Sequence, residues 1–239
     1  MILATIQPSF LPWLGYLEQM GVADIFVYLD DVKYTRQDWR NRNRLLNAAG
    51  QPEYLTVPVR ADSEKRLIKD ALIAESPDWP QKMMNKLKVW YAHAPYAKQY
   101  LPRLDDILKR KYSYLVDLNY EVMRLLTDAY GISTPTVRSS DAAVSATDKN
   151  QRLIDLCRRY GADVLYDGAA AANFIDLVRF QDAGIAVVFQ DYVPQVYPQG
   201  PHPFVGHLSS LDALLWCGEG ARGMLFGSPL PDALKSARV

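Results

Sequence analysis

The sequence is poor in the side chains that form disulfides and hold metals. Among its 239 residues it has two cysteines, Cys157 and Cys217, and three histidines, His93, His202 and His207. Two cysteines are too few for a disulfide framework, and no Cys/His pattern has the spacing of zinc ligands. We therefore expect neither a disulfide-stapled domain nor a metal site.

The chain also lacks net charge and long apolar runs. Lysine plus arginine and aspartate plus glutamate each number 27, so no nucleic-acid binding is expected and any anion site must be a local cluster. The apolar start MILATI has no basic leader or cleavage pattern, and no later run approaches the roughly 18 residues of a membrane span. The sequence therefore predicts a soluble, cytoplasmic protein without integral membrane association.

Strand and helix patterns alternate at both ends of the chain. ILATI, a Pro-bearing turn with the helix LGYLEQM, and the strand ADIFVYL form a β-α-β unit. Such a unit places its strands parallel and collects ligand-binding residues at their carboxyl ends. The fold class we expect is α/β, with a Rossmann-like, mostly parallel sheet, helices on both faces and a helical insertion.

The pattern changes twice along the chain. Residues 78–130 read as three helical segments, with Gly131 as a stop for the last one, and strands then alternate with helices again. We expect an N-terminal β-α-β part with an arginine-rich loop at 1–76, a helical insertion or cap at 77–131, and the C-terminal part of the α/β domain at 132–239. The segment 66–74 fits either a strand paired with 53–59 or a turn.

The stretch DWRNRNRLL, residues 38–46, alternates arginine with asparagine behind a tryptophan. In an extended strand Arg40, Arg42 and Arg44 would share one face at roughly 7 Å spacing. In a helix, Arg42 would point away from the other two. Because a planar guanidinium holds two oxygens of a phosphate or carboxylate, the run predicts a local anion site. The alternative is a solvated or ion-paired surface segment.

Two aspartates, Asp30 and Asp31, end the predicted second strand. They could bond sugar hydroxyls, pair with the arginines or hold a metal, although no third carboxylate stands at a metal-ligand spacing. Adjacent strand residues face opposite ways, so we expect only one of them in a given pocket. Gln7 and Asp167 stand at other predicted strand ends and are further candidates.

Cys217 is the one candidate for a thiol nucleophile, with His202, His207 and Asp212 a short distance upstream. It ends an apolar helix just before Gly218, where the helix dipole raises a thiol pKa, so a packed core cysteine is the competing interpretation. His93, where a helix breaks, could be a pocket base or a helix-end cation.

Seven motifs follow one another over nearly the whole chain. They are QPSFLPWLGYLEQM, DIFVYLDDVKYTRQDWRNRNRL, YLTVPV, SSD, GADVLYDG, VYPQ and LSSLDALLWCG. In this order they resemble the WbqC-like family, most specifically in DDVKY followed by WRNRNR. That family occurs in bacteria, often among genes for O-antigen and other surface polysaccharides, so the resemblance implies a pathway. Ile6 stands where many relatives carry His, and His207 where Gly or Asn is more usual.

The residues and the resemblance together define two candidate sets. The substrate-binding set is Gln7, Tyr16, Tyr34, Trp39, Arg40, Asn41, Arg42, Asn43, Arg44, Asp167 and Gln199. The catalytic set is Asp30, Asp31, His93 and Cys217.

Nucleotide sugars are the ligands that such a pathway suggests, because a pyrophosphate offers an anion and a sugar offers hydroxyls. We expect a transferase that places an acyl or aminoacyl group on the amine of a nucleotide-linked amino sugar. Arg42 and Arg44 would hold the pyrophosphate, and Asp30 or Asp31 would contact the sugar or take the proton. The acyl group would come from Cys217 or from an external thioester on coenzyme A or a carrier protein, with no tightly bound cofactor.

Two other functions fit the same residues. One is a nucleotidyl-transfer or nucleotide-binding protein, by fold analogy, although the His-x-Gly-His turn of that group is absent. The other is a non-catalytic assembly factor for polysaccharide enzymes. A ligand screen separates the three.

Overall fold

A five-stranded sheet forms the centre of the computed structural model, which describes residues 1–146, 148–227, 230–231 and 234. Its strands are β1 (Ile2–Ile6), β2 (Ile25–Tyr28), β5 (Thr136–Arg138), β6 (Val164–Asp167) and β7 (Ala186–Phe189). They lie in the order β5-β2-β1-β6-β7, and every neighbouring pair is parallel. Strands are thus added on one side of β1 first and on the other side afterwards, which is the doubly wound arrangement of a Rossmann-like domain.

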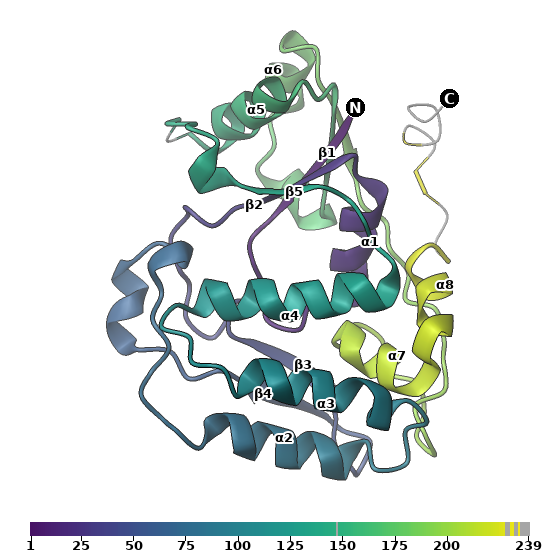
Figure 1. The fold of residues 1–239 in the computed structure, drawn as a ribbon. Helices are drawn as coiled ribbons and strands as arrows, with labels where there is room; N and C mark the ends of the chain where they lie inside the picture. The colour runs from purple at the N-terminus through teal and green to yellow at the C-terminus, as the bar shows by residue number, and fades with distance from the viewer. Residues whose placement is uncertain (147, 228–229, 232–233, 235–239) are drawn as a thin grey trace.

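Helices cover both faces of this sheet (Figure 1). On one face lie α1 (Leu14–Val22) and α4 (Leu115–Tyr130), and on the other α5 (Lys149–Tyr160) and α6 (Leu177–Asp182). Successive residues of each strand point to opposite faces of the pleated sheet and so pack into two separate cores, one on each face. Leu165, for example, packs with Cys157 of α5, whereas Tyr166 belongs to the core on the α1 side. The predicted α/β class is confirmed.

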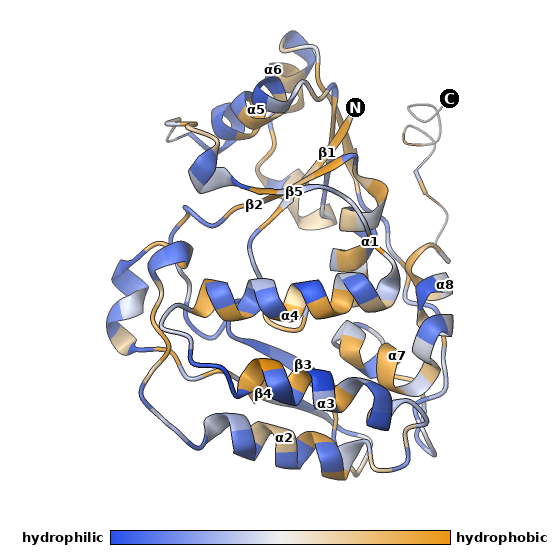
Figure 2. Cartoon of the chain, in the orientation of Figure 1, coloured by the Kyte–Doolittle hydropathy of each residue, from blue (hydrophilic) through white to orange (hydrophobic). Residues whose placement is uncertain are grey.

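Helices cover the central strands on both faces, so both faces of these strands are apolar. The residues of β1 and β2 are mostly orange in Figure 2, and α3 (Ala97–Leu108) and α4 carry orange and blue in alternation. Continuous apolar runs fit strands covered on both faces, and the helical alternation fits helices with one buried side. Gly131 ends α4 in the left-handed conformation, φ 63°, as the sequence predicted.

The segment 77–131, for which a helical insertion or cap was predicted, contains α2 (Trp79–Trp90), α3 and α4, which pack on one another in chain order. A separate antiparallel hairpin, β3 (Arg42–Leu46) and β4 (Pro52–Thr56), lies in this lower half of the molecule, where β3 contacts α7 (Ser210–Cys217) (Figure 1). The helix α8 (Ala221–Leu225) follows and touches α1. The arginine run therefore belongs to a hairpin outside the main sheet.

Short 3-10 turns fill the connections. They are η1 (Ala61–Lys65), η2 (Ile68–Asp70), η3 (Ser139–Asp141), η4 (Ala169–Asn173) and η5 (Gly218–Gly220). The segment 66–74, which the sequence left open, is a turn around η2 with single β-bridges on either side, one of them from Ile73 to Val59. Among the described residues, no helix combines the length and the hydropathy that crossing a membrane requires.

Candidate functional site

A cavity of about 310 Å³ opens where β1 ends. Its lining is Ile6, Ser9, Pro12, Trp13, Tyr16, Trp39, Arg40, Asn43, Arg44 and His207. Five of these residues belong to the predicted substrate-binding set: Tyr16, Trp39, Arg40, Asn43 and Arg44. The carboxyl end of a central strand is also where sheets of this class bind ligands. We therefore take this cavity as the candidate site.

The first wall of the site is the loop between β1 and α1, which is fastened to the hairpin. The backbone N–H of Phe10 donates to the carbonyl of Trp39 at 3.0 Å, and Asn43 Nδ2 donates to the carbonyl of Phe10 at 3.3 Å. Asn43 is buried, and its Oδ1 accepts from the N–H of Arg44 at 2.8 Å. One buried amide thus holds the loop and orders the strand that carries Arg44.

The opposite wall is the segment 207–210, which arrives from the other end of the sequence. The N–H of Ser209 donates to the carbonyl of Arg44 at 2.9 Å, and the N–H of Ser210 donates to the carbonyl of Pro12 at 2.8 Å. The segment therefore lies between the hairpin and the β1–α1 loop. It brings the exposed ring of His207 to 5.2 Å from the centre of the Trp13 ring.

Strained backbone surrounds the cavity. Leu11, Gln37 and His207 have φ values of 46°, 55° and 57°, in the left-handed region that L-residues seldom adopt. They lie in the three segments that wall the cavity. Such strain costs about 1 kcal/mol or more per residue and concentrates at functional sites. A left-handed backbone at position 207 also accounts for the Gly or Asn that the family resemblance implies there.

Arg40 and Arg44 both bring positive charge to the site, but they differ in the groups that they contact. Arg40 Nη2 donates to Asp38 Oδ2 at 2.8 Å, and the carbonyl of Arg40 accepts from Asn119 Nδ2 of α4 at 2.8 Å. Arg44 has no ion pair among the described residues, and its guanidinium lies 5.7 Å from the centre of the Trp39 ring. The Nε atoms of both arginines are buried and lack a hydrogen-bond partner in the described chain. One donor of each arginine, the Nε–H, is therefore unused within the described chain.

The electrostatics of the site favour an anion. Partial burial works against ionisation of Asp38, but the charge of Arg40 and the hydrogen bonds from Thr35 and Trp39 outweigh it and lower the pKa of Asp38. The Asp38 carboxylate neutralises the charge of Arg40, whereas the charge of Arg44 has no counter-ion among the described residues. Burial raises the pKa of Tyr16 well above its usual range, so its hydroxyl stays neutral and donates to the carbonyl of Gln7 at 3.3 Å.

The expectation that all three arginines share one face is wrong for Arg40. Arg40 precedes β3, whereas Arg42 and Arg44 lie on the strand, two residues apart and on the same side. Arg42 lines a neighbouring hollow of about 250 Å³ instead of the candidate site. Tyr34 and Asn41 line that hollow as well, and Asn41 Nδ2 donates to the carbonyl of Val57 at 2.8 Å.

Asp30 and Asp31 do not meet the arginine run. Asp30 is 1% exposed and accepts from the N–H of Ser140 at 3.0 Å and from its Oγ at 2.8 Å. Asp31 pairs with Arg152 of α5 and accepts from the hydroxyl of Ser139. No ion pair of the described residues joins either aspartate to Arg40, Arg42 or Arg44. The two carboxylates fasten η3 and α5 to the end of β2, so the predicted shared pocket is not formed.

Asp167 lies on the other face of the sheet. It follows Leu165 by two residues and so points toward α5, and its charge contributes to the raised pKa of Cys157. Burial raises the pKa of Asp167 to about 7, although the N–H of Gly168 donates to its Oδ1 at 2.7 Å. The candidate cavity lies on the α1 side, so Asp167 is not part of it.

Three further candidates lie outside the cavity. Gln199 is buried and donates to Asp212 Oδ2 at 2.8 Å, which makes it part of the internal packing. Cys217 ends α7, where burial and then the charge of Asp212 raise its pKa, so the thiol is not activated. His93 is exposed in the turn between α2 and α3. The remaining candidate, Gln7, directly follows β1, and its buried Oε1 has no hydrogen-bond partner in the described chain.

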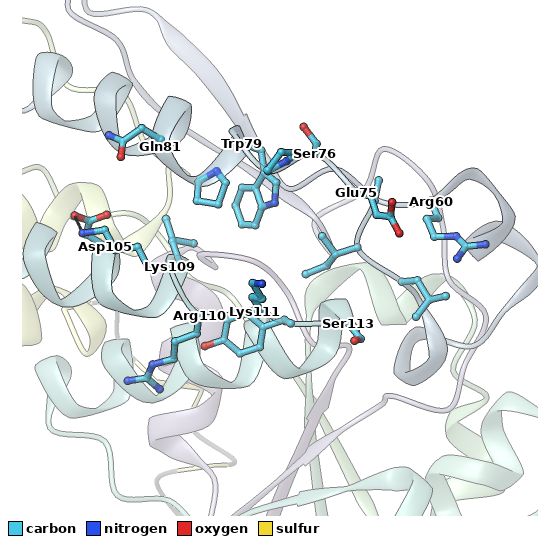
Figure 3. A pocket seen from close by; sticks show the side chains of 17 residues that line it. Arg60, Glu75, Ser76, Trp79, Gln81, Asp105, Lys109, Arg110, Lys111 and Ser113 are labelled. Atoms are coloured by element: carbon cyan, nitrogen blue, oxygen red, sulfur yellow. Dashed lines mark ion pairs between the residues drawn. The ribbon is translucent and has the colours of Figure 1, made fainter.

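A larger cavity lies elsewhere, between α2, α3 and the segments that flank them (Figure 3). It measures about 680 Å³ and contains none of the residues that the sequence singled out. Its cations are mostly engaged, since Lys109 pairs with Asp105 and Arg110 with Glu121. In the part of the chain that is described, no group of three His, Cys, Asp or Glu residues is placed to hold a metal ion.

Five lining residues are absent from the predicted sets: Ile6, Ser9, Pro12, Trp13 and His207. Ser9 and Trp13 stand in the Pro-bearing turn after the first strand, where the strand-end rule could have identified them. His207 carries no local signal, because hydrogen bonds between segments more than 160 residues apart bring it to the site, as from Ser209 to Arg44.

A family model matches the chain over residues 7–223, which span every wall of the cavity. The chain belongs to the WbqC-like protein family. This member is similar to an uncharacterized protein of Mycobacterium tuberculosis, Rv1507c, with 31% identity over 191 residues that cover 79% of this chain and 81% of the relative. No solved structure matches the chain.

Proposed function

We propose that this WbqC-like protein binds a nucleotide-linked sugar at the cavity beside β1 and modifies the sugar as a transferase. The observation that supports this is the joint presence of Arg40, Arg44, Trp13 and Trp39 around one hollow. Guanidinium groups donate in pairs to phosphate oxygens, and indole faces pack against the apolar face of a sugar or a base.

The size of the cavity narrows the choice of ligand. Small-molecule sites measure roughly 300–1,000 Å³, and this one, at about 310 Å³, is at the lower limit. It suits a single sugar ring better than a complete nucleotide sugar. The occurrence of the family among genes for surface polysaccharides supports a sugar of that pathway.

The reaction we propose is acyl or aminoacyl transfer from an external thioester, on coenzyme A or a carrier protein, to the amine of the sugar. The nitrogen forms a bond to the acyl carbon, the carbon–sulfur bond breaks, the nitrogen loses a proton and the thiol is released. Cys217 has no part in this step because it lies outside the cavity and burial raises its pKa. Of the lining side chains, the imidazole of His207 is the group that we assign to accept this proton.

A second candidate function has one observation in its favour. The strand order β5-β2-β1-β6-β7 is that of many nucleotide-binding domains, so the protein could bind a nucleoside triphosphate or transfer its nucleotidyl group. This is an argument from fold, which does not decide chemistry. The arginine and indole lining favours the first proposal.

A thermal-shift screen tests the proposal. UDP-, GDP- and dTDP-linked sugars should raise the Tm, whereas stabilisation by nucleoside triphosphates with Mg²⁺ would favour the second candidate. Stabilisation by neither group would contradict both and would favour a non-catalytic assembly factor. Acyl-coenzyme A, tested with and without the nucleotide sugar, reports on the donor.

A further inference from the structure

The outer face of the hairpin carries four stacked side chains, which we call the hairpin ladder: Arg44, Trp39, Tyr54 and Arg42. The Arg44 guanidinium lies 5.7 Å from the Trp39 ring centre, the Trp39 and Tyr54 ring centres are 6.3 Å apart, and the Arg42 guanidinium lies 4.3 Å from the Tyr54 ring centre. Arg44 and Trp39 also line the candidate cavity, and Arg42 lines the neighbouring hollow. The ladder thus connects the two hollows.

The ladder is open to solvent and carries unneutralised charge. Trp39 is 42% exposed and Tyr54 41%. Neither Arg42 nor Arg44 forms an ion pair among the described residues, whereas Arg40, beside them in sequence, does. Adjacent exposed aromatic rings next to free guanidinium groups attract ligands that are both flat and anionic. A nucleotide has both properties.

The pairing of the hairpin strands fixes the direction of the ladder. Tyr54 is the β4 partner of Arg44 in the β3–β4 register, and the Trp39 ring contacts both side chains, so a group held at Arg44 extends along Trp39 toward the Tyr54 ring. The cavity is large enough for a sugar ring, and the remainder of a nucleotide sugar must leave it through its rim. Arg44 belongs to both the lining and the ladder and therefore marks that exit.

We infer that the hairpin ladder is the subsite for the nucleoside diphosphate, an inference that rests on the proposed function. The sugar occupies the cavity, the pyrophosphate lies at Arg44, and the base packs on the exposed aromatic surface that Tyr54 extends away from the cavity. Arg42, behind the Tyr54 ring, adds positive charge. Because the base lies on an open surface, the protein selects strongly for the sugar and weakly for the base.

The test is calorimetric titration of wild type, Tyr54→Ala and Tyr54→Phe with UDP-N-acetylglucosamine, UDP and N-acetylglucosamine 1-phosphate, or with the matching trio if a GDP or dTDP sugar gives the larger thermal shift. Tyr54→Ala should weaken the binding of the nucleotide sugar and of the nucleoside diphosphate about tenfold. It should leave the affinity for the sugar phosphate within about twofold of the wild-type value. Tyr54→Phe should bind like the wild type. Tyr114→Ala, which changes an equally exposed tyrosine directly before α4, is the matched control.

Several outcomes would overturn the inference. Unchanged binding of the nucleotide sugar by Tyr54→Ala, together with its loss in Arg44→Gln, rejects the ladder and leaves the proposed function standing. If the binding of all three ligands weakens equally, Tyr54 only supports the shape of the cavity and does not contact the base. Tighter binding of a single-stranded oligonucleotide than of the nucleoside diphosphate, lost in Tyr54→Ala, assigns the ladder to another ligand class. Failure of the wild type to bind any nucleotide sugar rejects the proposed function itself.

Discussion

The backbone N–H of Ser209 donates to the carbonyl of Arg44 at 2.9 Å and joins the last third of the chain to the arginine hairpin. This bond fixes the segment 207–210 against the hairpin, and residues of both segments line the cavity. It also brings His207, two residues earlier, into the lining of the cavity, beside the Trp13 ring. The chemistry that we propose depends on this contact between segments that are far apart in sequence.

Replacement of Asn43 by alanine tests the internal support of the site. Asn43→Ala removes the donor to the carbonyl of Phe10 and the acceptor for the N–H of Arg44 in a buried place. We expect a loss of about 1–3 kcal/mol in the free energy of unfolding, measured by urea titration. Asn85→Ala, on the exposed side of α2, should change it by less than about 0.5 kcal/mol. Equal effects of the two substitutions would contradict the supporting role.

Position 207 should accept glycine and reject a β-branched residue. Because φ is 57°, His207→Gly relieves backbone strain while loosening the unfolded chain, so stability should stay within about 1 kcal/mol of the wild type. His207→Val should cost more than about 1 kcal/mol. Valine tolerated as well as glycine in chemical denaturation would argue against the left-handed conformation.

The imidazole of His207 is also proposed to accept the proton from the amine. In turnover assays His207→Gln should therefore be slower by about 100-fold at unchanged ligand affinity.

Asp167 makes stability depend on pH. Its pKa is raised from about 4 in an unfolded chain to about 7 in the folded protein. A raised carboxyl pKa contributes stability that is fully present below the unfolded value and is lost as the pH rises through the folded value. The free energy of unfolding of Asp167→Asn, relative to that of the wild type, should therefore rise between about pH 4 and pH 7. Above pH 7 the variant should remain more stable by roughly 1–3 kcal/mol. Parallel stability curves of the two proteins across this range would refute the shift.

Cys217 should be dispensable for turnover and slow to alkylate. Burial raises its pKa, so little thiolate is present at pH 7. We expect Cys217→Ser to keep the wild-type rate within about twofold. A loss of 100-fold or more, or trapping of an acyl group on this residue by mass spectrometry, would establish covalent transfer instead.

The sequence was informative where local pattern decides structure. The sequence left strand and helix open for the run of arginines, but it predicted that an extended run would have its arginines on one face. Arg42 and Arg44 do lie on one side of β3, because alternation along a strand follows from backbone geometry alone. The sequence also predicted ligand-binding residues at the carboxyl ends of the strands, since doubly wound sheets place ligands there, and the candidate cavity opens at such an end.

Partners contributed by distant segments could not be predicted. Asp30 and Asp31 end a strand as expected, but Ser139, Ser140 and Arg152, more than 100 residues later, occupy both carboxylates. Gln199 is likewise taken by Asp212 in the packed interior. Each of these pairings depends on tertiary packing, for which a single sequence has no periodic signal.

The most direct test is the affinity of Arg44→Gln for the nucleotide sugar that stabilises the wild type best, measured by titration calorimetry. Arg158→Gln, which removes the same charge from an exposed position on α5, is the matched control. The account predicts that Arg44→Gln weakens binding about 10- to 100-fold, as expected for the loss of a charge-assisted hydrogen bond, and that Arg158→Gln stays within about twofold. Equal affinities of the two variants would contradict a sugar-nucleotide site at the end of β1.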